Sequence, residues 1–437
     1  MMNGKGCLGK LATKADNVKL LYAIKSLDHA HGGAERVLAD VTDDLFRKGH
    51  DISILTFDRP GGESFYNIHP SIKRISLGIG HPEKRSTFLE TFKRILAVRK
   101  AIKQDKPDAV VAFMHSMFIP TALALVGTGV PVIASEHIVP EHYKSRKLEF
   151  ALFLVSSLFV KKFTVISEQV RDLYPAYLRK RMEVMPNPVF NAEHQNREQD
   201  QDSKHQELLR KVILNVGRLD PQKDQKTLIR AFAQIAPYFP EWDLRIVGEG
   251  ELREELETLI RQYGLEERIF LPGLTKNIAS EYEAADIFAI SSKYESFGLA
   301  TAEALSHGLP ALGFADCPGT NEVIQSGYNG LLVNSHDRAG VFAKGLQHLI
   351  QNPALRARYG MNGVKSVEQY SSDRVARNWE ALLSQIKADA PSRINRYVYR
   401  HRKPSYRAAT VANQNFTSTT IPANSQDAAS SAVPIDK

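Results

Sequence analysis

The sequence predicts an α/β protein with two Rossmann-like domains, each a doubly wound parallel sheet, that face each other across a cleft. Short apolar runs typical of buried strands alternate with helical patterns over most of the chain, which favours parallel sheets. The alternation stops once, at a polar and charged stretch, and then begins again. The length of 437 residues also exceeds that of one ordinary domain.

The same pattern sets the expected domain boundaries. The sequence Pro-Asn-Pro at residues 186–188 ends the first series of strands and helices, and a polar stretch follows it. The predicted divisions are a flexible N-terminus (1–17), an N-terminal Rossmann-like domain (18–188), a linker (189–207), a C-terminal Rossmann-like domain (208–370), a C-terminal helix that crosses back to the N-terminal domain (371–388) and a basic, then disordered tail (389–437).

Composition argues against several classes of protein. The only cysteines, Cys7 and Cys317, allow neither a disulfide framework nor a zinc cluster, and they fit a reducing cytosol. The longest apolar run, at residues 148–160, is interrupted by polar residues and is too short to span a bilayer, so we expect no integral membrane protein. Six of the eight net positive charges lie at residues 391–407. Because the body is then close to neutral, we expect no nucleic-acid partner.

A strand–glycine–helix pattern in the first domain predicts a ligand-binding turn. Residues 18–24 form an apolar run, and Gly32-Gly33-Ala34-Glu35-Arg36 then begins a helix. A glycine pair lets the backbone approach a diphosphate or a sugar without a Cβ in the way. The three-glycine fingerprint of dinucleotide-binding proteins is missing from this turn.

Two histidines follow neighbouring predicted strands. His115 comes just past the strand at residues 109–113, and His137 comes just past the strand at residues 132–135. Ligands of open parallel sheets bind beyond the carboxyl ends of the strands, so both histidines are candidates for a functional site. A structural role is the alternative for each of them. Ser167 follows another predicted strand and is a candidate helix cap.

Residues 88–104 predict a basic amphipathic helix. It is either a solvated surface helix or a patch for anionic lipid headgroups. Residues 144–162, apolar between basic ends, and the basic tail are further candidates for membrane contact. The expected apolar side consists of Phe88, Phe92, Ile95, Leu96 and Ile102. The expected surface cations are Lys93, Arg94, Arg99, Lys100 and Lys103.

Two cations follow a predicted strand in the second domain. The strand at residues 212–217 ends at Gly217, and Arg218 and Lys223 lie in the loop after it. Arginine offers a planar fork and lysine a point charge, a combination that suits a diphosphate. Residues 244–250 predict another strand with a tight turn at Gly248.

Residues 294–303 carry two carboxylates around a small-residue turn. The apolar run at residues 284–290 ends before Glu295, and a predicted helix at residues 300–307 contains Glu303. Such a strand-to-helix junction presents free N–H groups and the positive end of the helix dipole to an anion. The local alternative is a dipole-favoured Glu295 and a solvated Glu303.

Taken together, these motifs resemble the retaining glycosyltransferases of family 4, which have the GT-B fold. The resemblance covers roughly residues 18–383, and within the family the chain looks most like bacterial enzymes that extend lipid-diphosphate-linked glycans for surface polysaccharides or glycoproteins. It implies a hexosyltransferase that moves a sugar from a nucleotide-diphosphate sugar to a hydroxyl of a glycan acceptor, with retention of anomeric configuration. The motifs that carry it are Gly32-Gly33-Ala34-Glu35-Arg36, Ser135-Glu136-His137, Val165-Ile166-Ser167-Glu168, Pro186-Asn187-Pro188, Gly217-Arg218 with Lys223, Gly248-Glu249-Gly250, and the pair Glu295 and Glu303.

The resemblance also implies roles for individual residues on the donor side. Arg218 and Lys223 would hold the diphosphate of a UDP- or GDP-sugar. Glu303 would bind the ribose, and Glu295 would contact the transferred sugar. The implied catalytic residues are Glu295, His115, Arg218 and Lys223, and the implied donor-binding residues are Gly33, Gly217, Arg218, Lys223, Gly248, Glu295, Ser296, Phe297, Gly298, Leu299 and Glu303.

The resemblance assigns the acceptor to the N-terminal domain. His115 would lie near the acceptor and the reacting centre, and His137 is a second candidate there. The family needs no metal, which agrees with reading Asp200 and Asp202 as part of a solvated linker, and no cofactor is expected beyond the nucleotide-sugar co-substrate. A lipid-linked acceptor favours a cytoplasmic protein bound peripherally to the anionic inner face of the plasma membrane.

Three alternatives stay open. A non-hydrolysing nucleotide-sugar epimerase would share the two domains and the cleft but would need no acceptor. A dinucleotide-dependent oxidoreductase would need the missing fingerprint and an acidic residue after the second strand, for which Asp58 is a loose match. A non-catalytic binding module would leave the charged cleft without a purpose.

Overall fold

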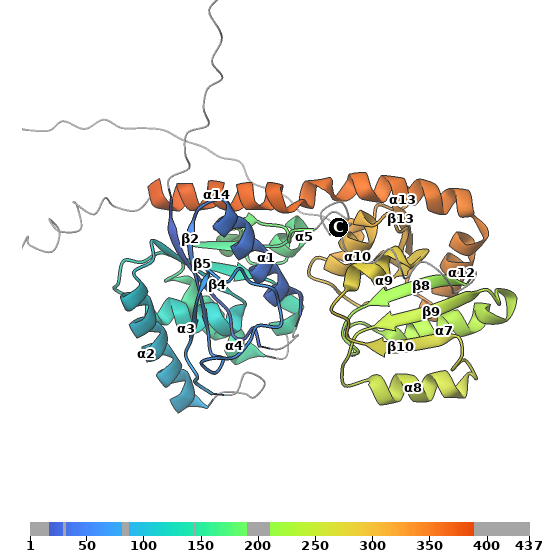
Figure 1. The fold of residues 1–437 in the computed structure, drawn as a ribbon, viewed down its shortest axis with the longest axis horizontal. Helices are drawn as coiled ribbons and strands as arrows, with labels where there is room; N and C mark the ends of the chain where they lie inside the picture. Colours follow the sequence, from blue (N-terminus) through green and yellow to red (C-terminus); the bar gives the residue numbers. More distant parts are fainter. Residues whose placement is uncertain (1–16, 29–31, 81–86, 144–145, 190–209, 389–437) are drawn as a thin grey trace, which may run out of the picture. The chain divides into compact units, whose positions relative to one another are not determined.

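The N-terminal sheet is built around the buried strand β1 (Lys19–Ala23). The structure, a computed structural model, describes residues 17–28, 32–80, 87–143, 146–189 and 210–388 (Figure 1). The further elements of this domain are α1 (Gly33–Arg47), β2 (Asp51–Thr56), β3 (Lys73–Ser76), α2 (Phe88–Asp105), β4 (Ala109–Phe113), α3 (His115–Ala124), β5 (Val132–Glu136), η1 (Pro140–Tyr143), α4 (Lys147–Ser157), β6 (Lys162–Val165), α5 (Glu168–Asp172), α6 (Ala176–Arg179) and β7 (Met182–Val184).

The second sheet begins with β8 (Lys211–Val216), and a long helical segment follows it at the end of the described chain. Its remaining elements are α7 (Gln225–Ile235), η3 (Ala236–Tyr238), β9 (Trp242–Val247), α8 (Arg253–Gln262), β10 (Ile269–Gly273), α9 (Ile278–Glu283), β11 (Ile287–Ala289), α10 (Leu299–Ser306), β12 (Ala311–Phe314), α11 (Thr320–Val323), β13 (Gly330–Val333), α12 (Arg338–Gln351), α13 (Pro353–Val367), η4 (Glu368–Tyr370) and α14 (Ser372–Ala388).

Both sheets are parallel and doubly wound. The strand orders are β3-β2-β1-β4-β5-β6-β7 and β10-β9-β8-β11-β12-β13, and the registered strand pairs are all parallel. Each order reverses at one place, between β1 and β4 in the first sheet and between β8 and β11 in the second. Ligands bind beyond the carboxyl ends of the strands at such a reversal. The predicted fold class of two Rossmann-like parallel-sheet domains is therefore confirmed.

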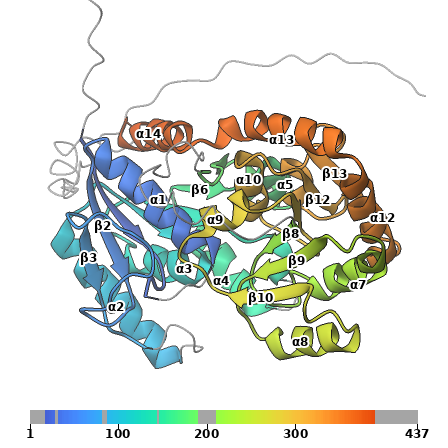
Figure 2. The ribbon, with the colours of Figure 1, turned by 45° about the vertical axis from the view of Figure 1, so that its right-hand side comes forward.

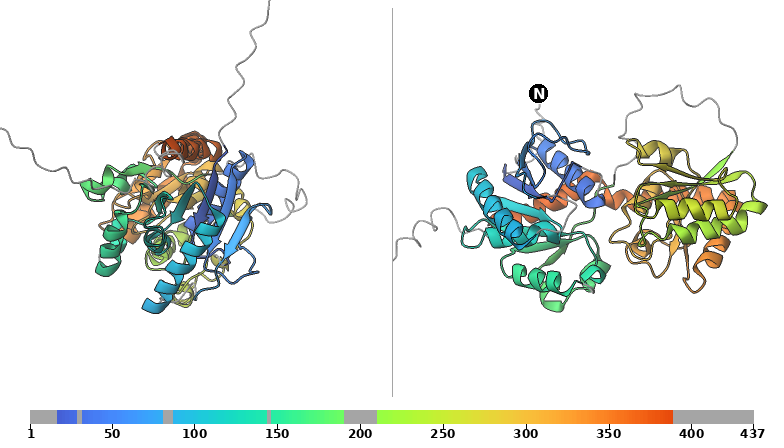
Figure 3. Two further views of the ribbon diagram at one scale, coloured as in Figure 1. Left: turned by 90° about the vertical axis from the view of Figure 1, so that its left-hand side faces the viewer. Right: turned by 90° about the horizontal axis from the view of Figure 1, so that it is seen from below.

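Helices cover both faces of each sheet. In the N-terminal domain α1 and α14 pack on one face, and α2, α3 and α4 pack on the other (Figures 1 and 3). In the C-terminal domain α7, α8 and α12 cover one face, and α9 and α10 cover the other (Figure 2). Strands that are buried on both faces are apolar along their whole length, which is why the sequence shows continuous apolar runs and no alternation.

The last described helix, α14, belongs to the N-terminal core although it follows the C-terminal domain. The centroid of the Trp379 ring lies 6.2 Å from that of Tyr22 and 6.5 Å from that of Phe113, and Trp379 is buried. Large buried aromatic rings contribute strongly to core packing. The Val189 N–H also donates to the Tyr370 carbonyl at 2.8 Å. The chain thus leaves and re-enters the N-terminal domain at neighbouring points.

Helix α2 differs from its expected orientation in two respects. Arg94, expected among the surface cations, is 5% exposed, and its guanidinium lies 4.5 Å from the centre of the Phe57 ring. Phe92 and Leu96, expected on the packed side, are 55% and 52% exposed. The cation–π contact and the long aliphatic stem allow Arg94 to be buried. The side of α2 that packs on the N-terminal domain is instead centred on Val98, Ala101 and Ile102, which belong to the hydrophobic core under this helix.

Two strands of the N-terminal sheet were not predicted. The edge strand β3 carries two cations in four residues, and β7 has only three residues, so neither has an apolar run of strand length. The linker beyond Val189 with Asp200 and Asp202, the N-terminus with Cys7, and the basic tail lie outside the described residues. Within the described part of the chain, no helix combines the length and the apolar character needed to cross a bilayer.

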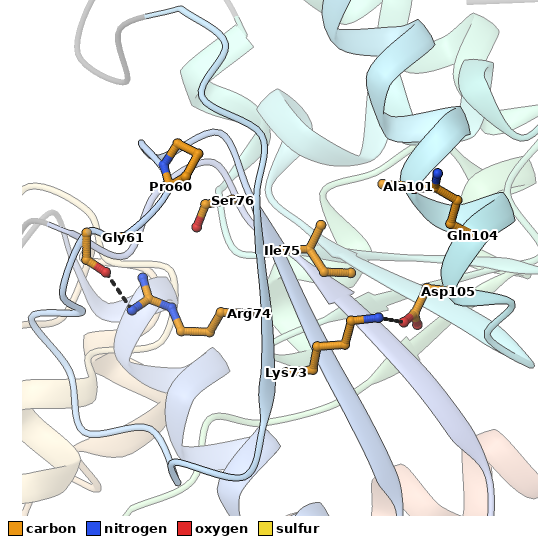
Figure 4. Close-up of a pocket in the computed structure, with 10 residues that line it drawn as sticks. Pro60, Gly61, Lys73, Arg74, Ile75, Ser76, Ala101, Gln104 and Asp105 are labelled. Carbon is orange, nitrogen blue, oxygen red and sulfur yellow. Dashed lines mark hydrogen bonds and ion pairs between the residues drawn. The ribbon is translucent and has the colours of Figure 1, made fainter.

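A hollow of about 550 Å³ lies beside the edge strand β3 and is lined by β3, by α2 and by the loop at residues 60–62 (Figure 4). Lys73 points toward Asp105 across it, and Lys73 Nζ lies 2.7 Å from Asp105 Oδ1. The ion pair neutralises the buried Asp105 carboxylate. No residue assigned to the candidate functional site lines this hollow, so it is a separate feature.

Candidate functional site

A larger cavity of about 1190 Å³ lies at the reversals of both sheets and takes its lining from both domains. Of the residues predicted for the site, His115 alone does not line it. The structure brings the others together because each motif follows a strand that borders a reversal or lies one strand away from it. The predicted residues in the lining are Gly33, His137, Gly217, Arg218, Lys223, Gly248, Glu295, Ser296, Phe297, Gly298, Leu299 and Glu303.

Lys223 and Glu295 form an ion pair at the reversal between β8 and β11. Lys223 Nζ lies 2.6 Å from Glu295 Oε1 and 2.8 Å from Oε2, and Ser292 Oγ donates to Oε1 at 2.6 Å. Glu295 is only 7% exposed, and these contacts offset the desolvation of its charge. A cation and a carboxylate are thus fixed side by side at the cavity wall. The cation can hold an anion, and the carboxylate can accept hydrogen bonds from hydroxyl groups.

Arg218 follows β8 and is the more exposed of the two predicted cations. Its Nη2 lies 3.0 Å from Asp220 Oδ2, and 58% of its side chain is exposed. The loop that carries it is held by close packing of two glycines. A Cβ on Gly248, which has φ +149°, would lie 2.0 Å from the Gly217 carbonyl oxygen. Gly248 is therefore needed for this backbone approach, which positions the Arg218 loop.

Helix α10 begins beside the ion pair. Gly298 precedes it with φ 77°, a left-handed conformation that glycine adopts without strain. The first N–H groups of a helix have no partner within the helix, and the helix dipole favours an anion at this end. Phe297 is buried and anchors the turn, while Gly298 and Leu299 line the cavity. The wall thus combines backbone donors with Arg218 and Lys223.

Glu303 is buried in α10 at 6% exposure, so the local alternative of a solvated Glu303 is wrong. The Tyr282 hydroxyl donates to Glu303 Oε2 at 2.9 Å. From the other domain, Arg36 Nη1 lies 2.8 Å from Glu303 Oε1. Sequence reasoning assigned Arg36 no role beyond its place in the glycine motif, because a linear pattern cannot show which residue of another domain a side chain contacts.

Glu35 is a second lining residue that received no role from the sequence. Burial raises the pKa of Glu35, and the nearby Arg218 partly counteracts this rise. Opposite charges of the two domains therefore interact at this cavity in two places: Arg36 and Glu303 form an ion pair, and the charge of Arg218 acts on Glu35. The signal available in the sequence was the pair of adjacent, oppositely charged residues that stands two and three positions after Gly33.

His137 lines the cavity from the N-terminal domain. Its Nε2 lies 3.0 Å from Ser135 Oγ, and its ring stacks on that of Phe113 with centroids 4.8 Å apart. Burial lowers the pKa of His137 to about 3. The imidazole is therefore neutral at neutral pH and can exchange hydrogen bonds without carrying charge.

His115 is the first residue of α3 and points to a different set of partners. Its Nε2 lies 3.6 Å from Glu149 Oε2, and its ring meets the ring of Tyr143 edge-on. The Tyr143 hydroxyl donates to the buried Glu136 at 2.8 Å. Burial raises the pKa of Glu136 to about 7. A contact of His115 with an acceptor stays a prediction.

The predicted cap of α5 is confirmed. Ser167 Oγ accepts from the Val170 N–H at 3.1 Å and donates to Glu322 Oε1 at 2.6 Å. The second bond joins the N-terminal domain to α11 of the C-terminal domain. In the part of the chain that the structure describes, no group of three or more His, Cys, Asp and Glu side chains is arranged to hold a metal ion.

Two family models match the chain, one for each domain. The model described as Glycosyltransferase Family 4 matches residues 31–190, and the model described as Glycosyl transferases group 1 matches residues 196–366. The first match contains the glycine motif and His137, and the second contains Arg218, Lys223 and both carboxylates. Together with the two parallel-sheet domains, these matches define the class of protein as a glycosyltransferase of the GT-B type.

Similar proteins agree with this class over almost their whole length. The chain is 26% identical to GalNAc-alpha-(1->4)-GalNAc-alpha-(1->3)-diNAcBac-PP-undecaprenol alpha-1,4-N-acetyl-D-galactosaminyltransferase of Campylobacter jejuni, with 85% of this chain and 99% of the relative covered. It is 24% identical to the amylovoran biosynthesis glycosyltransferase AmsD of Erwinia amylovora, with 84% and 99% covered. The solved structure of HepE of Anabaena with UDP and glucose shares its fold, with a TM-score of 0.70, 20% identity, and 84% and 100% covered. The chain thus consists of a Glycosyltransferase Family 4 domain followed by a Glycosyl transferases group 1 domain.

Proposed function

We propose that this glycosyltransferase moves a hexose from a UDP- or GDP-sugar to a hydroxyl of a glycan carried on a lipid diphosphate, with retention of anomeric configuration. The observation that carries the proposal is the group of Arg218, Lys223 and the start of α10 around one cavity wall. Together these groups offer two cations and backbone donors to a diphosphate. They favour departure of the nucleoside diphosphate by stabilising the negative charge that develops on it, with no metal required.

The two carboxylates take separate parts in this proposal. Glu295, fixed by Lys223 and Ser292, accepts hydrogen bonds from hydroxyls of the transferred sugar. Glu303 lies in α10, four residues after Leu299, and accepts hydrogen bonds from the ribose hydroxyls. Lys223 then contacts both the diphosphate and Glu295, which keeps the sugar and its leaving group in one orientation.

The acceptor lies against the N-terminal wall in the same proposal. His137, neutral and lining the cavity, is the group available to a glycan hydroxyl there. His115 contacts the Tyr143 ring, and the Tyr143 hydroxyl donates to Glu136, the residue before His137; in this proposal His115 acts on the acceptor through these groups. The undecaprenol-linked substrate in the name of the Campylobacter relative supports a lipid diphosphate as the carrier.

We also propose that the protein binds peripherally to an anionic membrane, at the inner face of the plasma membrane. Helices α2 and α4 both pack against α3, and both expose large apolar side chains. Basic residues accompany them, including the exposed Lys93 and Lys100. Apolar side chains insert at the headgroup boundary while lysines attract anionic lipid. The exposed apolar residues on α2, α4 and the residues after α4 are Leu89, Phe92, Leu96, Leu148, Leu152, Val155, Leu158 and Phe159.

A thermal-shift panel of UDP- and GDP-sugars tests the donor assignment. We expect one nucleotide sugar to raise the melting temperature of the wild type, because a ligand that binds the folded state stabilises it. Lys223→Ala should lose this shift, whereas Lys226→Ala should keep it, because the Lys226 side chain extends from α7 and pairs with Glu255 of α8. Equal shifts in both variants would remove Lys223 from the donor site. Proton NMR of the product then reads the anomeric configuration.

Vesicle sedimentation tests the membrane assignment. The wild type should bind vesicles that contain anionic lipid and bind neutral vesicles weakly. Leu148→Ser with Leu158→Ser should lower binding by about fivefold, because both side chains are about three-quarters exposed and would leave the headgroup boundary. Tyr238→Ser is the matched control, since this residue is 77% exposed in the C-terminal domain. Equal binding to neutral and anionic vesicles would contradict the electrostatic part.

A further inference from the structure

Arg36 connects the two walls of the cavity at the carboxylate that the proposed function assigns to the ribose. It lies in the first turn of α1, three residues after Gly33, and it forms an ion pair with Glu303. A Cβ on Gly33 would lie 3.6 Å from the side chain of Leu299, which is four residues before Glu303 in α10. The starts of α1 and α10 therefore meet twice, first at Gly33 and Leu299 and again one helical turn later.

Glu303 is held at both carboxylate oxygens by groups from different domains. Tyr282 of the C-terminal domain donates to Oε2 at 2.9 Å, and Arg36 of the N-terminal domain lies 2.8 Å from Oε1. An ionised carboxylate has about four acceptor positions. Two contacts fix its orientation and leave capacity for two further donors, which is the number of hydroxyl groups on a nucleotide's ribose.

The electrostatics of this pair favour a permanent contact. Glu303 raises the pKa of Arg36, so the guanidinium stays protonated. Asp40 Oδ2 lies 3.8 Å from Arg36 Nε, and burial raises the pKa of Asp40 to about 7. Without Arg36, the Glu303 carboxylate would be buried near another acidic group with Tyr282 as its remaining described partner. Such a buried charge without its cation is costly, so the carboxylate would turn toward solvent and lose its orientation.

We propose that Arg36 is a positioning residue of the nucleoside site, which holds the Glu303 carboxylate from the opposite domain in the orientation that accepts both ribose hydroxyls. The inference rests on the proposed function, because it takes a ribonucleoside diphosphate as the ligand. Recognition of the ribose then requires both domains. The C-terminal domain supplies the carboxylate, and the N-terminal domain orients it.

Calorimetric binding of a nucleoside diphosphate and its 2′,3′-dideoxy analogue tests this inference. The ligand is UDP or GDP, whichever the wild type binds. Arg36→Ala should weaken binding of the ribonucleotide about tenfold and leave binding of the dideoxy analogue within about twofold, because the analogue has no hydroxyls for Glu303 to accept. Arg36→Lys should fall between these, since lysine keeps the charge and loses the fork.

Three further variants complete the experiment. Arg47→Ala is the control, because Arg47 also lies in α1 but forms its ion pair with Asp43 among the described residues. This variant should bind both ligands as the wild type does. Tyr282→Phe removes the other partner of Glu303 and should reproduce the selective loss of the ribonucleotide. Arg36→Met keeps the aliphatic stem and replaces Arg36→Ala if the alanine variant does not fold.

The outcomes separate this inference from the proposed function. An equal loss of both ligands in Arg36→Ala, or no loss of either, would overturn the inference while the nucleotide site stands. A wild-type protein that binds neither UDP nor GDP would overturn the proposed function and the inference with it. A loss confined to the ribonucleotide supports both.

Discussion

The two sheets reverse direction in the same way, yet the reversals carry different chemistry. Between β8 and β11 the loops hold a partly buried ion pair, an exposed arginine and the start of α10. Between β1 and β4 the loops hold a glycine pair with a left-handed Met114 before α3, and the neutral His137 follows the next strand. One topology therefore provides two walls, one suited to an anion and the other to neutral hydroxyl groups. The strand order decides where ligands bind, and the loop residues decide which ligands bind there.

The same difference appears in how closely the loops are packed. At the C-terminal reversal a Cβ on Gly248 would lie 2.0 Å from a backbone oxygen, whereas at the N-terminal reversal a Cβ on Gly33 would meet its nearest described neighbour at 3.6 Å. The first glycine serves the fold of its own domain. Gly33 is not required by such packing, so its backbone is available for contact with a ligand.

Removal of the partly buried cation Lys223 should give the largest effect. Lys223→Ala should lower turnover by about 100-fold or more, because the cation stabilises the departing diphosphate and orients Glu295; this corresponds to roughly 3 kcal/mol of transition-state stabilisation. Steady-state assays with the donor identified by thermal shift measure it, and Lys226→Ala is the control. Turnover within twofold of the wild type would show that the two walls do not differ as described.

The two glycines should respond in opposite ways to the same substitution. Gly248→Ala should destabilise the protein by about 2 kcal/mol, because its φ is unfavourable for alanine and its Cβ would overlap the Gly217 carbonyl. Gly33→Ala should leave the free energy of unfolding within about 0.5 kcal/mol of the wild type and lower donor affinity, since its backbone faces the cavity. Urea unfolding and donor titration measure both. A destabilised Gly33→Ala would break the contrast.

His137 should have a smaller effect that is confined to the acceptor wall. His137→Gln should lower kcat/KM for the acceptor about tenfold, or roughly 1.4 kcal/mol, and leave donor binding unchanged. The imidazole is neutral, so the loss should not depend on pH between 5 and 8. Acceptor kinetics at several pH values test this. A matching loss of donor affinity would assign His137 to the donor side.

Glu136 should give the smallest effect, on stability and not on the donor. Its pKa is raised to about 7 from an ordinary value of 4.5, so the folded state binds more protons than the unfolded state in this interval. Its contribution to stability is complete below pH 4.5 and is lost as the pH rises to 7, by an amount on the order of 1 kcal/mol or more. Glu136→Gln should remove this decline. Urea unfolding from pH 4.5 to 8 measures the difference between the two proteins, and parallel curves would contradict it.

Much of the architecture follows from the sequence alone. Continuous apolar runs separated by helical patterns predicted both parallel sheets, because strands covered on both faces need apolar residues throughout. The same reasoning placed Gly217, Lys223 and Glu295 after strands of one sheet, where the carboxyl ends meet. The edge strand β3 escaped prediction because its side chains are partly exposed and two of its four residues are cations.

What only the tertiary structure decided is which side chains meet across the chain. Local pattern left Glu303 between a solvated and a binding role, and its burial between Tyr282 and Arg36 comes from elements far apart in sequence. The same holds for Arg94. The helical pattern predicted a surface position for it, but its guanidinium packs on the Phe57 ring. Periodicity records which face of an element is apolar. It carries no information on the charged partner supplied by another domain, because that partner is fixed by packing between distant segments.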